Sequence, residues 1–470
     1  MRMSSPAAHP LGSAGHWLTI ALCLVSAADG LMRTLMDHTE DLETVYINHV
    51  TSRHRDKRSA NQSPNELHVT FTAQNQPIRL RLKRHAAHTS LPVYTLRQGQ
   101  AVKKTLEDTP RISFYHDSNH GATFIYTRNR NSSRPFDLDG SMFINGLEYI
   151  LTPNHLVTWV GGGGAAHSLR RLNSKLSFGH DGIDTRGILW YLLDMPELRP
   201  NIDPYTRLAS QLRTAQRRDR RLREENKDVG HWGLSTHGFR QKRQASNPAV
   251  HYIELSMIAD YAVWKRFLRF TSGNEEQAFK ELQQYYLFMA VMMDVRYRSV
   301  KEVDPRLDIR ITPVSLIVTD VQEEALWTEK YRVGRSFVQS INSLYALREW
   351  VRRGSGVPRA DHTMLFSGYD LLGGRSDSST IGVAFIGTAC THNSVSLIEE
   401  YFTGTSGTVS AHELGHSLDA EHDANYRSCS DLSANVMSTQ AVFPKEPRLV
   451  SNPWKFSSCS VDAFGAFLET

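Results

Sequence analysis

The pattern of hydrophobic and polar positions divides the chain into two regions with different secondary structure. In the first region, apolar and other residues alternate over 68–85 as in a strand, and 145–153 and 188–193 are further strand candidates. In the second region, 275–299 and 336–353 have helical periodicity. Further strands are expected at 251–260, 307–319, 363–368 and 379–390. The pattern predicts a β-rich region followed by a compact α/β domain.

Length and composition are those of a globular protein with more than one domain. The chain has 470 residues, which is long for one domain, and its 40% hydrophobic and 22% charged residues are ordinary for folded proteins. The net charge of +5 is modest and gathered in local runs, so nucleic acid is not indicated as a partner. Four cysteines are too few for a scaffold built from disulfides.

Residues 1–28 have the pattern of a secretory signal peptide. An apolar core at 17–25 follows a positively charged start, and the small residues at 26–28 suit cleavage. The alternative is a buried strand or helix. The core is too short to cross a bilayer and no other stretch has the length and apolarity to do so, which predicts secretion without a membrane span. Export would make the sequons at Asn61 and Asn131 usable for glycosylation.

A basic tetrad stands between the two regions. Residues 207–243 are polar and highly charged, which is typical of a solvated linker or an exposed helix. They end at an Arg-x-Lys-Arg sequence that closes with Arg243, of the kind that furin-like proteases cut. Because this tetrad lies at the boundary of an ordered domain, we predict cleavage after Arg243. A similar tetrad at 55–58 is open to either interpretation, cleavage or solvated surface.

The stretch HELGHSLDAEHD at 412–423 carries the strongest chemical signal. On a helix, His412 and His416 share one face, one turn apart, so both imidazoles can bind a single Zn²⁺. Glu413 beside the first histidine can act as a general base on a metal-bound water. His422 lies six residues further on, so the chain must turn back to bring it in. Three protein ligands leave one position open, which is the arrangement of a catalytic zinc site.

Two other interpretations of this stretch are a surface helix and a structural zinc site. A surface helix can carry His and Glu by chance, but the Gly/Ser/Thr sequence at 403–411 gives a loop that can cap a helix just before the first ligand. Met437, in a tight segment downstream, further favours the zinc site. A structural zinc protein of another fold would need a fourth protein ligand, and only Cys429 lies near enough in the sequence.

With its Met-containing segment, the stretch resembles the metzincin signature H-E-x-x-H-x-x-G-x-x-H-D and Met-turn. The Asp after the third His resembles the reprolysin (adamalysin) family, which includes ADAM, ADAMTS, snake-venom and tick salivary metalloproteases. The resemblance covers about 248–465. It implies a metzincin-type α/β zinc protease domain, a twisted, mostly parallel sheet with helices, preceded by a β-rich pro-domain. By position it implies the zinc ligands His412, His416 and His422, the general base Glu413, and the Met-turn methionine Met437.

The resemblance also implies a division of the chain and a function. The expected segments are a signal peptide at 1–28, a pro-domain at 29–206, the charged linker at 207–243 and a catalytic domain at 244–470. The implied function is that of a secreted zinc endopeptidase made as a zymogen, with extracellular proteins as substrates. A segment of the substrate would pair, as an added strand, with the sheet edge formed by 379–390.

One position departs from the signature. Asp419 stands where the signature has Gly, at a point where the helix closes in a left-handed conformation. Asp tolerates this conformation better than most residues, so the departure bears on activity more than on the fold. The alternative function is a catalytically weak metzincin scaffold that acts as an extracellular binding protein. Asp419 and an unpaired Cys429 are the features that favour it.

The resemblance makes further predictions about cysteines and calcium. It implies a disulfide between Cys390 and Cys459, which would leave Cys429 without a partner. With the signal removed, the pro-segment has no cysteine to bind zinc, so latency would come from steric cover or another ligand. The resemblance also implies a Ca²⁺ site with the Cys459 carbonyl. Its carboxylate ligands would be Glu254, Asp361 and Asp462, although ordinary solvated acids are an equal alternative.

Overall fold

The structure is a computed structural model that describes residues 39–50, 63–86, 91–106, 112–128, 136–154, 164–172, 182–183, 249–354, 356, 358–373, 378–441, 444–446 and 448–469. Some of the sequence-based predictions lie outside these residues: the signal peptide, the strand at 188–193, the linker with Arg243, and the sequons at Asn61 and Asn131. None of the helices in the described part of the chain is long and apolar enough to cross a membrane.

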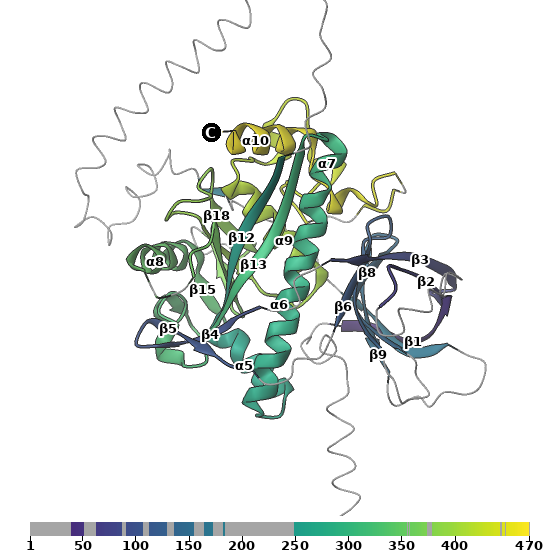
Figure 1. Cartoon of the computed structure of the whole chain (residues 1–470), viewed down its shortest axis with the longest axis horizontal. Helices are drawn as coiled ribbons and strands as arrows, with labels where there is room; N and C mark the ends of the chain where they lie inside the picture. The colour runs from purple at the N-terminus through teal and green to yellow at the C-terminus, as the bar shows by residue number, and fades with distance from the viewer. Residues whose placement is uncertain are drawn as a thin grey trace, which may run out of the picture.

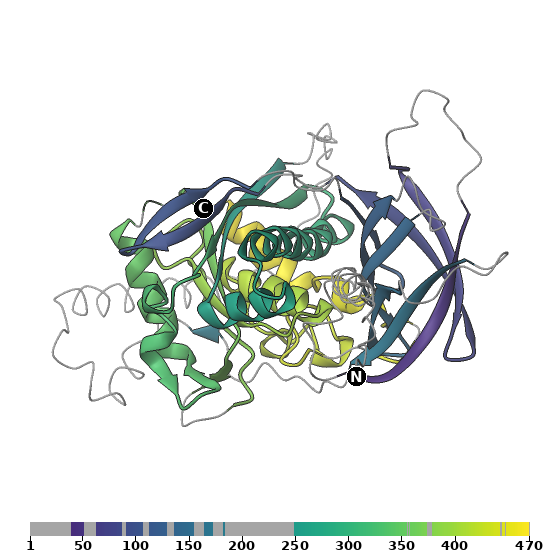
Figure 2. The same ribbon diagram turned by 90° about the horizontal axis from the view of Figure 1, so that it is seen from below.

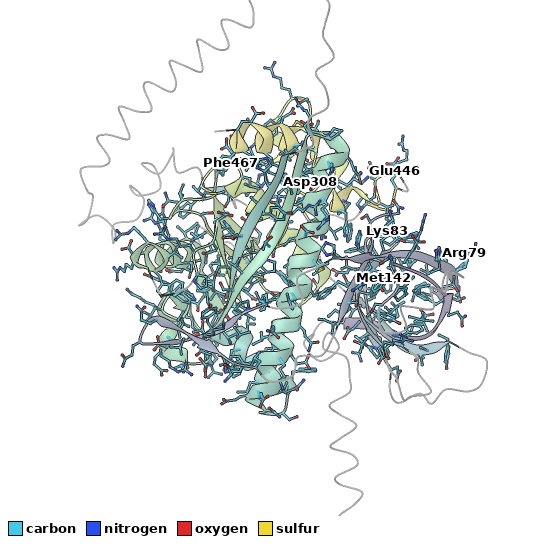
Figure 3. All side chains as sticks on the ribbon, in the orientation of Figure 1. Arg79, Lys83, Met142, Asp308, Glu446 and Phe467 are labelled. Carbon is cyan, nitrogen blue, oxygen red and sulfur yellow. A yellow bond between two sulfur atoms is a disulfide. The ribbon has the colours of Figure 1, made fainter. Side chains whose placement is uncertain are left out.

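Eight strands of the N-terminal region close into a barrel, in the order β1-β10-β9-β8-β7-β6-β3-β2 (Figure 1). They are β1 (Thr39–Val50), β2 (Glu66–Ala73), β3 (Gln76–His85), β6 (Ser113–Asp117), β7 (Ala122–Arg128), β8 (Phe136–Ile144), β9 (Leu147–Pro153) and β10 (Ala165–Leu172). Side chains alternate between the interior and the outside, so Met142 is buried while Arg79 and Lys83 lie on the surface (Figure 3). The β-rich region is thus confirmed.

The single strand predicted over 68–85 is wrong in one respect, because this stretch forms two paired strands. Gln74 and Asn75, with φ of 50° and 57°, make the turn between β2 and β3. The alternation of apolar residues continues on both sides of the turn, and therefore the pattern did not reveal the break.

The second region is built on an eight-stranded sheet in the order β11-β18-β19-β16-β12-β13-β4-β5. Its strands are β4 (Val93–Arg97), β5 (Gln100–Lys104), β11 (Gly182–Ile183), β12 (Ala249–Ala259), β13 (Leu307–Val318), β16 (His362–Ser367), β18 (Gly382–Phe385) and β19 (Val395–Glu399). Neighbours from β19 to β4 run parallel, whereas β18 is antiparallel to β19. The prediction of a mostly parallel sheet in an α/β fold is confirmed.

Three of these strands come from the N-terminal region. Hairpin β4–β5 extends the sheet beyond β13, and the two-residue strand β11 pairs with β18 at the opposite edge. Figure 2 shows the hairpin against the second region, on the far side from the barrel. A small sheet is made of β14 (Arg332–Val333), β15 (Phe337–Gln339) and β17 (Asp370–Leu372).

The helices pack on this sheet and between it and the barrel. They are α5 (Tyr261–Phe270), α6 (Glu275–Arg298), α7 (Val300–Val303), α8 (Ser340–Arg353), α9 (Gly404–Ser417) and α10 (Ser458–Leu468). Short 3₁₀ turns are η4 (Gln322–Glu324), η5 (Glu329–Tyr331), η7 (Asp423–Asn425), η8 (Asp431–Ser433) and η9 (Asn452–Trp454). Helix α6 is buried on most sides, because it lies between β13, α9 and the barrel (Figure 1).

Candidate metal centre

Helix α9 carries the first two histidines and is buried along its whole length. The side chain of Thr403 accepts a hydrogen bond from the Thr405 amide and caps the helix. The sequence at 403–411 was expected to be a loop, and this is wrong, because the helix already begins at Gly404. Its small residues allow close packing: a Cβ at Gly407 would lie 2.9 Å from the Cβ of Met292 on α6. Tertiary packing here overrides the low helix propensity of Gly, Ser and Thr.

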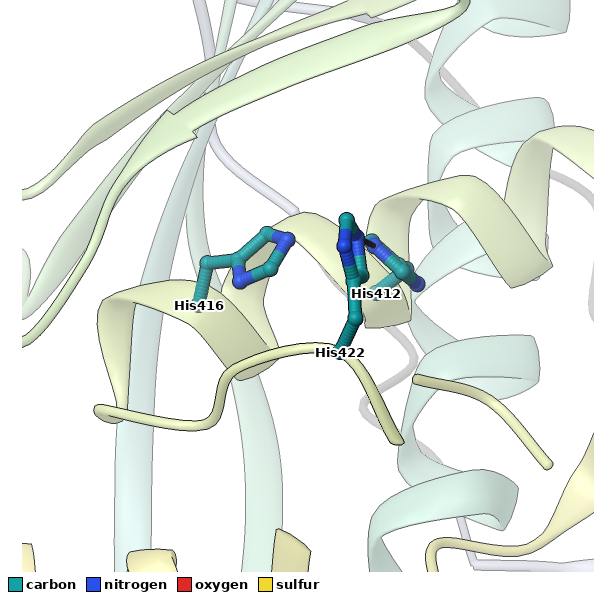
Figure 4. Close-up of side chains that lie close together, drawn as sticks. All are labelled: His412, His416 and His422. Carbon is teal, nitrogen blue, oxygen red and sulfur yellow. Dashed lines mark hydrogen bonds between the residues drawn. The ribbon is translucent and has the colours of Figure 1, made fainter. Parts of the chain in front are cut away.

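The chain reverses directly after α9 to bring in the third histidine. Asp419 has φ of 72°, which confirms the left-handed conformation predicted for this position. The Ala420 amide then donates to the Gly415 carbonyl at 3.1 Å, which closes the end of the helix. The reversal places His422 over the same helix face as the other two histidines (Figure 4).

The three imidazoles converge on one point. Nε2 of His412 lies 3.2 Å from Nε2 of His422, and ligand atoms of all three histidines lie within 4.8 Å of one another. Tetrahedral zinc with Zn–N bonds of about 2.0–2.1 Å needs nitrogens about 3.3 Å apart. The spacing in the structure therefore fits Zn²⁺.

Backbone carbonyls orient two of the imidazoles. Nδ1 of His412 donates to the Val436 carbonyl at 2.7 Å, and Nδ1 of His416 donates to the Ala420 carbonyl at 2.8 Å. With the proton held on Nδ1, the lone pair of each Nε2 points to the common centre, as a metal ligand requires. The donor set thus matches a zinc site both in chemistry and in tautomer.

Glu413 is fully buried and lies beneath β18, the strand next to the short edge strand β11. Gly382 of β18 makes room for it, because a Cβ at that position would collide with the Glu413 carboxylate. Sequence reasoning missed Gly382. The available signal was a glycine inside an apolar strand, which often marks the close approach of another group.

The segment around Met437 packs against α9 and holds the loop that carries His422. Met437 is fully buried, and a Cβ at Gly415 would lie 2.5 Å from its Sδ, so this glycine allows the sulfur to pack against α9. The Met437 carbonyl accepts from the Asp423 amide at 2.8 Å, which ties the loop of the third histidine to this segment.

Asp423 is a second residue that sequence reasoning did not assign a role. Its Oδ1 accepts from the Ser457 hydroxyl at 2.6 Å, and burial raises the pKa of its carboxyl. Asp423 therefore joins the loop of His422 to the start of α10. The signal for it was the Asp that directly follows the third histidine.

A family model for the reprolysin (M12B) zinc metalloproteases matches residues 251–470. Residues 251–470 therefore form a reprolysin-family domain. Among curated proteins, it is 28% identical over 252 residues to "A disintegrin and metalloproteinase with thrombospondin motifs like" of Bombyx mori, covering 49% of this chain and 33% of the relative. It is 28% identical over 212 residues to the zinc metalloproteinase-disintegrin-like atrase-A of Naja atra, covering 45% and 29%.

One relative also aligns with the N-terminal region of this chain. "A disintegrin and metalloproteinase with thrombospondin motifs 18" of Mus musculus is 24% identical over 454 residues, covering 90% of this chain and 34% of the relative. The chain thus spans about a third of the length of these curated relatives.

The disulfide predicted between Cys390 and Cys459 is wrong. Cys459 is bonded to Cys429, not to Cys390, and Cys390 is a free, exposed cysteine. Cys459 begins α10 beside the loop that contains Cys429, and the hydroxyl of Ser428 in that loop lies 3.2 Å from the Cys459 sulfur. The thiol of Cys390 instead contacts the Asp361 carboxylate at 3.5 Å. Because Cys429 is bonded to Cys459, it does not supply a fourth ligand for a structural zinc site.

The acids predicted to bind calcium are only partly brought together. The Glu254 amide donates to the Asp361 carboxylate at 2.8 Å. Among the residues that the structure describes, however, the three histidines form the one group of at least three metal-binding side chains within 4.8 Å. Asp462 on α10 does not complete such a group with the other two acids, so calcium binding stays a prediction.

Proposed function

We propose that this protein is a secreted, zinc-dependent endopeptidase that is made as a zymogen and cleaves extracellular proteins. One observation carries the proposal: three convergent histidine Nε2 atoms lie beside a buried glutamate, directly under strand β18 of the sheet. The signal-like sequence at 1–28 supports secretion. The pairing of Cys429 removes one of the two features that favoured a binding scaffold without catalytic power.

The roles of the residues follow from their positions. Zn²⁺ held by His412, His416 and His422 would lower the pKa of a water molecule and polarise the carbonyl of the peptide bond. Glu413 takes the proton of the attacking water on its carboxylate and returns it to the leaving amine. Burial of Glu413 keeps its carboxylate in place and excludes bulk water during both transfers.

Strand β18 is the proposed substrate-binding element. Its far neighbour in the sheet is β11, whose residues 182–183 pair in parallel with Ala384 and Phe385. This backbone pairing occupies the edge that a substrate strand would use. It supports latency by steric cover, in a pro-segment whose sequence from 29 to 243 contains no cysteine.

Activation in this proposal begins with cleavage after Arg243 by a furin-like protease. The Arg-x-Lys-Arg tetrad at 240–243 supports this step. Cleavage there separates 182–183 covalently from the domain whose edge they cover. Ca²⁺ remains a proposed second cofactor, for which the contact between Glu254 and Asp361 offers partial support.

The test is cleavage of a quenched-peptide library by the secreted, processed chain and by its Glu413→Gln variant. Loss of the general base should lower kcat by about 10²–10⁴-fold. Metal analysis should still find one zinc per chain, because the histidines are untouched. Glu421→Gln, in the turn between the ligands, is the matched control and should keep its activity. Full activity of Glu413→Gln, or activity that survives a zinc chelator, would disprove the proposal.

A further inference from the structure

The N-terminal region holds the two edges of the catalytic sheet in very different ways. Residues 93–95 of β4 pair in parallel with 316–318 of β13, and β5 covers β4 in turn. At the other edge, β11 pairs with β18 through two residues only. The edge beside the zinc site is therefore paired with a two-residue strand, whereas the distant edge is paired with a complete hairpin.

The hairpin and the barrel share hydrophobic cores with the catalytic domain. Phe114 and Phe143 of the barrel belong to the same buried cluster as α6 and α9, and Phe143 packs edge-on against Trp454 with ring centroids 5.0 Å apart. Leu96 of β4 is fully buried in the cluster that includes Leu344 and Leu347 of α8. Interfaces that resemble a domain core cut in two are typical of permanent assemblies.

Buried charged groups also meet across this interface. The carboxylate of Glu148 on β9 accepts from the Gly404 amide at 2.5 Å and from the Thr405 hydroxyl at 2.6 Å, at the first turn of α9. His85 of β3 contacts Asp294 of α6 at 2.7 Å, and both side chains are almost fully buried. Separation of the two regions would break these hydrogen bonds between groups that have little access to water.

We propose that the barrel and hairpin, which lie within residues 39–172, stay bound to the catalytic domain as a second subunit after cleavage at Arg243. Only β11 needs to leave β18 for the substrate edge to open. The barrel contacts α6, the start of α9 and Trp454, and the hairpin contacts the distant edge, so neither has to move. This inference rests on the proposed zymogen function and deepens it.

The first experiment uses the purified full chain, cut after Arg243 by furin or by a specific protease whose site is inserted there. The two fragments should elute together in a 1:1 ratio from gel filtration, even after dilution to nanomolar concentration. If the catalytic fragment elutes alone and folded by circular dichroism, the proposal is overturned. The readout needs no activity, so it is independent of the protease function: an active, separate fragment would count against this inference alone.

Hydrogen exchange before and after the cut tests the second half of the proposal. The amides of Gly382–Phe385 in β18 should exchange faster once the chain is cut, while 316–318 of β13 and the first turn of α9 stay protected. Unchanged protection of β18 would contradict the release of β11. Loss of protection at both edges would contradict retention of the hairpin.

Variants in the full chain locate the interaction. Glu148→Ala should weaken the association of the cut fragments by about 100-fold, as expected when one partner of a buried charged contact is removed. Glu43→Ala is the matched control, because Glu43 is on the barrel surface and contacts only Gln74 there among the described residues. Arg97→Ala removes the hairpin's surface ion pair with Asp320 and, should Glu148→Ala not fold, provides a second probe with an effect of about 2–5-fold. Equal association of all three variants would contradict the proposed interface.

Discussion

Two buried glutamates lie at opposite ends of α9 and perform different tasks. Glu148, from the barrel, is fixed at the first turn by an amide and a hydroxyl donor. Glu413, in the last turns, lies under β18, where Gly382 leaves space for its carboxylate. Glu148 thus caps a helix, whereas Glu413 lies where we propose that a substrate is cleaved. Burial alone therefore does not identify a catalytic acid or base.

The largest expected effect comes from filling the space above Glu413. Gly382→Ala places a methyl group against the carboxylate, so Glu413 must move, and we expect kcat/KM to fall about 100-fold. The melting temperature should fall as well, because β18 and Glu413 are buried and the added methyl group overpacks them. Gly465→Ala is the control, since a Cβ there meets no atom within 4 Å. Peptide assays and thermal melts check both, and full activity of Gly382→Ala would refute the role of this glycine.

The second effect concerns the loop that brings His422 to the end of α9. Cys429→Ser breaks the disulfide to Cys459, whose partners are 30 residues apart. By loop-closure entropy the loss is about 3–4 kcal/mol of unfolding free energy. Cys390→Ser, which removes the free thiol, should leave stability nearly unchanged. Urea unfolding without reductant measures both, and the reverse ranking would argue for the pairing predicted from sequence.

The third effect is a pH dependence of the unfolding free energy that comes from Glu148. Burial raises the pKa of Glu148 to about 7, above the usual value of 4.5 for a glutamate. The folded chain therefore binds this proton more tightly, and its stabilising effect is present at low pH and lost as pH rises from 4.5 towards 7. Glu148→Gln should remove about 2–3 kcal/mol of this pH dependence. Urea unfolding at pH 5.5 and 7.5 measures this dependence. An equal change in unfolding free energy for the unchanged chain and for Glu148→Gln would exclude Glu148 as its source.

The smallest effect is expected at the end of α9. Asp419→Gly relieves a left-handed conformation, with φ of 72°, and should stabilise the protein by about 0.5–1 kcal/mol. Activity should change less than threefold, because the turn is already formed. A large gain in activity would instead show that Asp419 weakens the site, as the binding-scaffold alternative requires.

Local spacing made much of this site predictable. The interval between His412 and His416 places them on one helix face, and the backbone conformation of Asp419 follows from its place after the last turn. The parallel sheet and helix α6 likewise follow from apolar runs and periodicity. These features depend on residues that are close in sequence, where pattern and structure are directly linked.

The missed features depend on residues that meet only through the fold. No local pattern pairs Cys429 with Cys459, or places β4 beside β13 across more than 200 residues. The start of α9 was missed because its small residues favour loops in isolation and helix only when packed against Met292. Glu148 lies in an ordinary strand pattern, and the residues next to it in the sequence do not indicate the helix that it caps.

The pairing of β4 with β13 also affects how the protein is made. Val93 leaves the ribosome more than 200 residues before its partner Leu316. At about 5–20 residues per second, the hairpin has to wait roughly 10–45 s for the strand that it joins. The barrel strands that precede Leu172 can close during this time, but the hairpin edge stays exposed throughout. Biosynthesis of this protein thus includes a built-in delay, during which the hairpin has no partner strand.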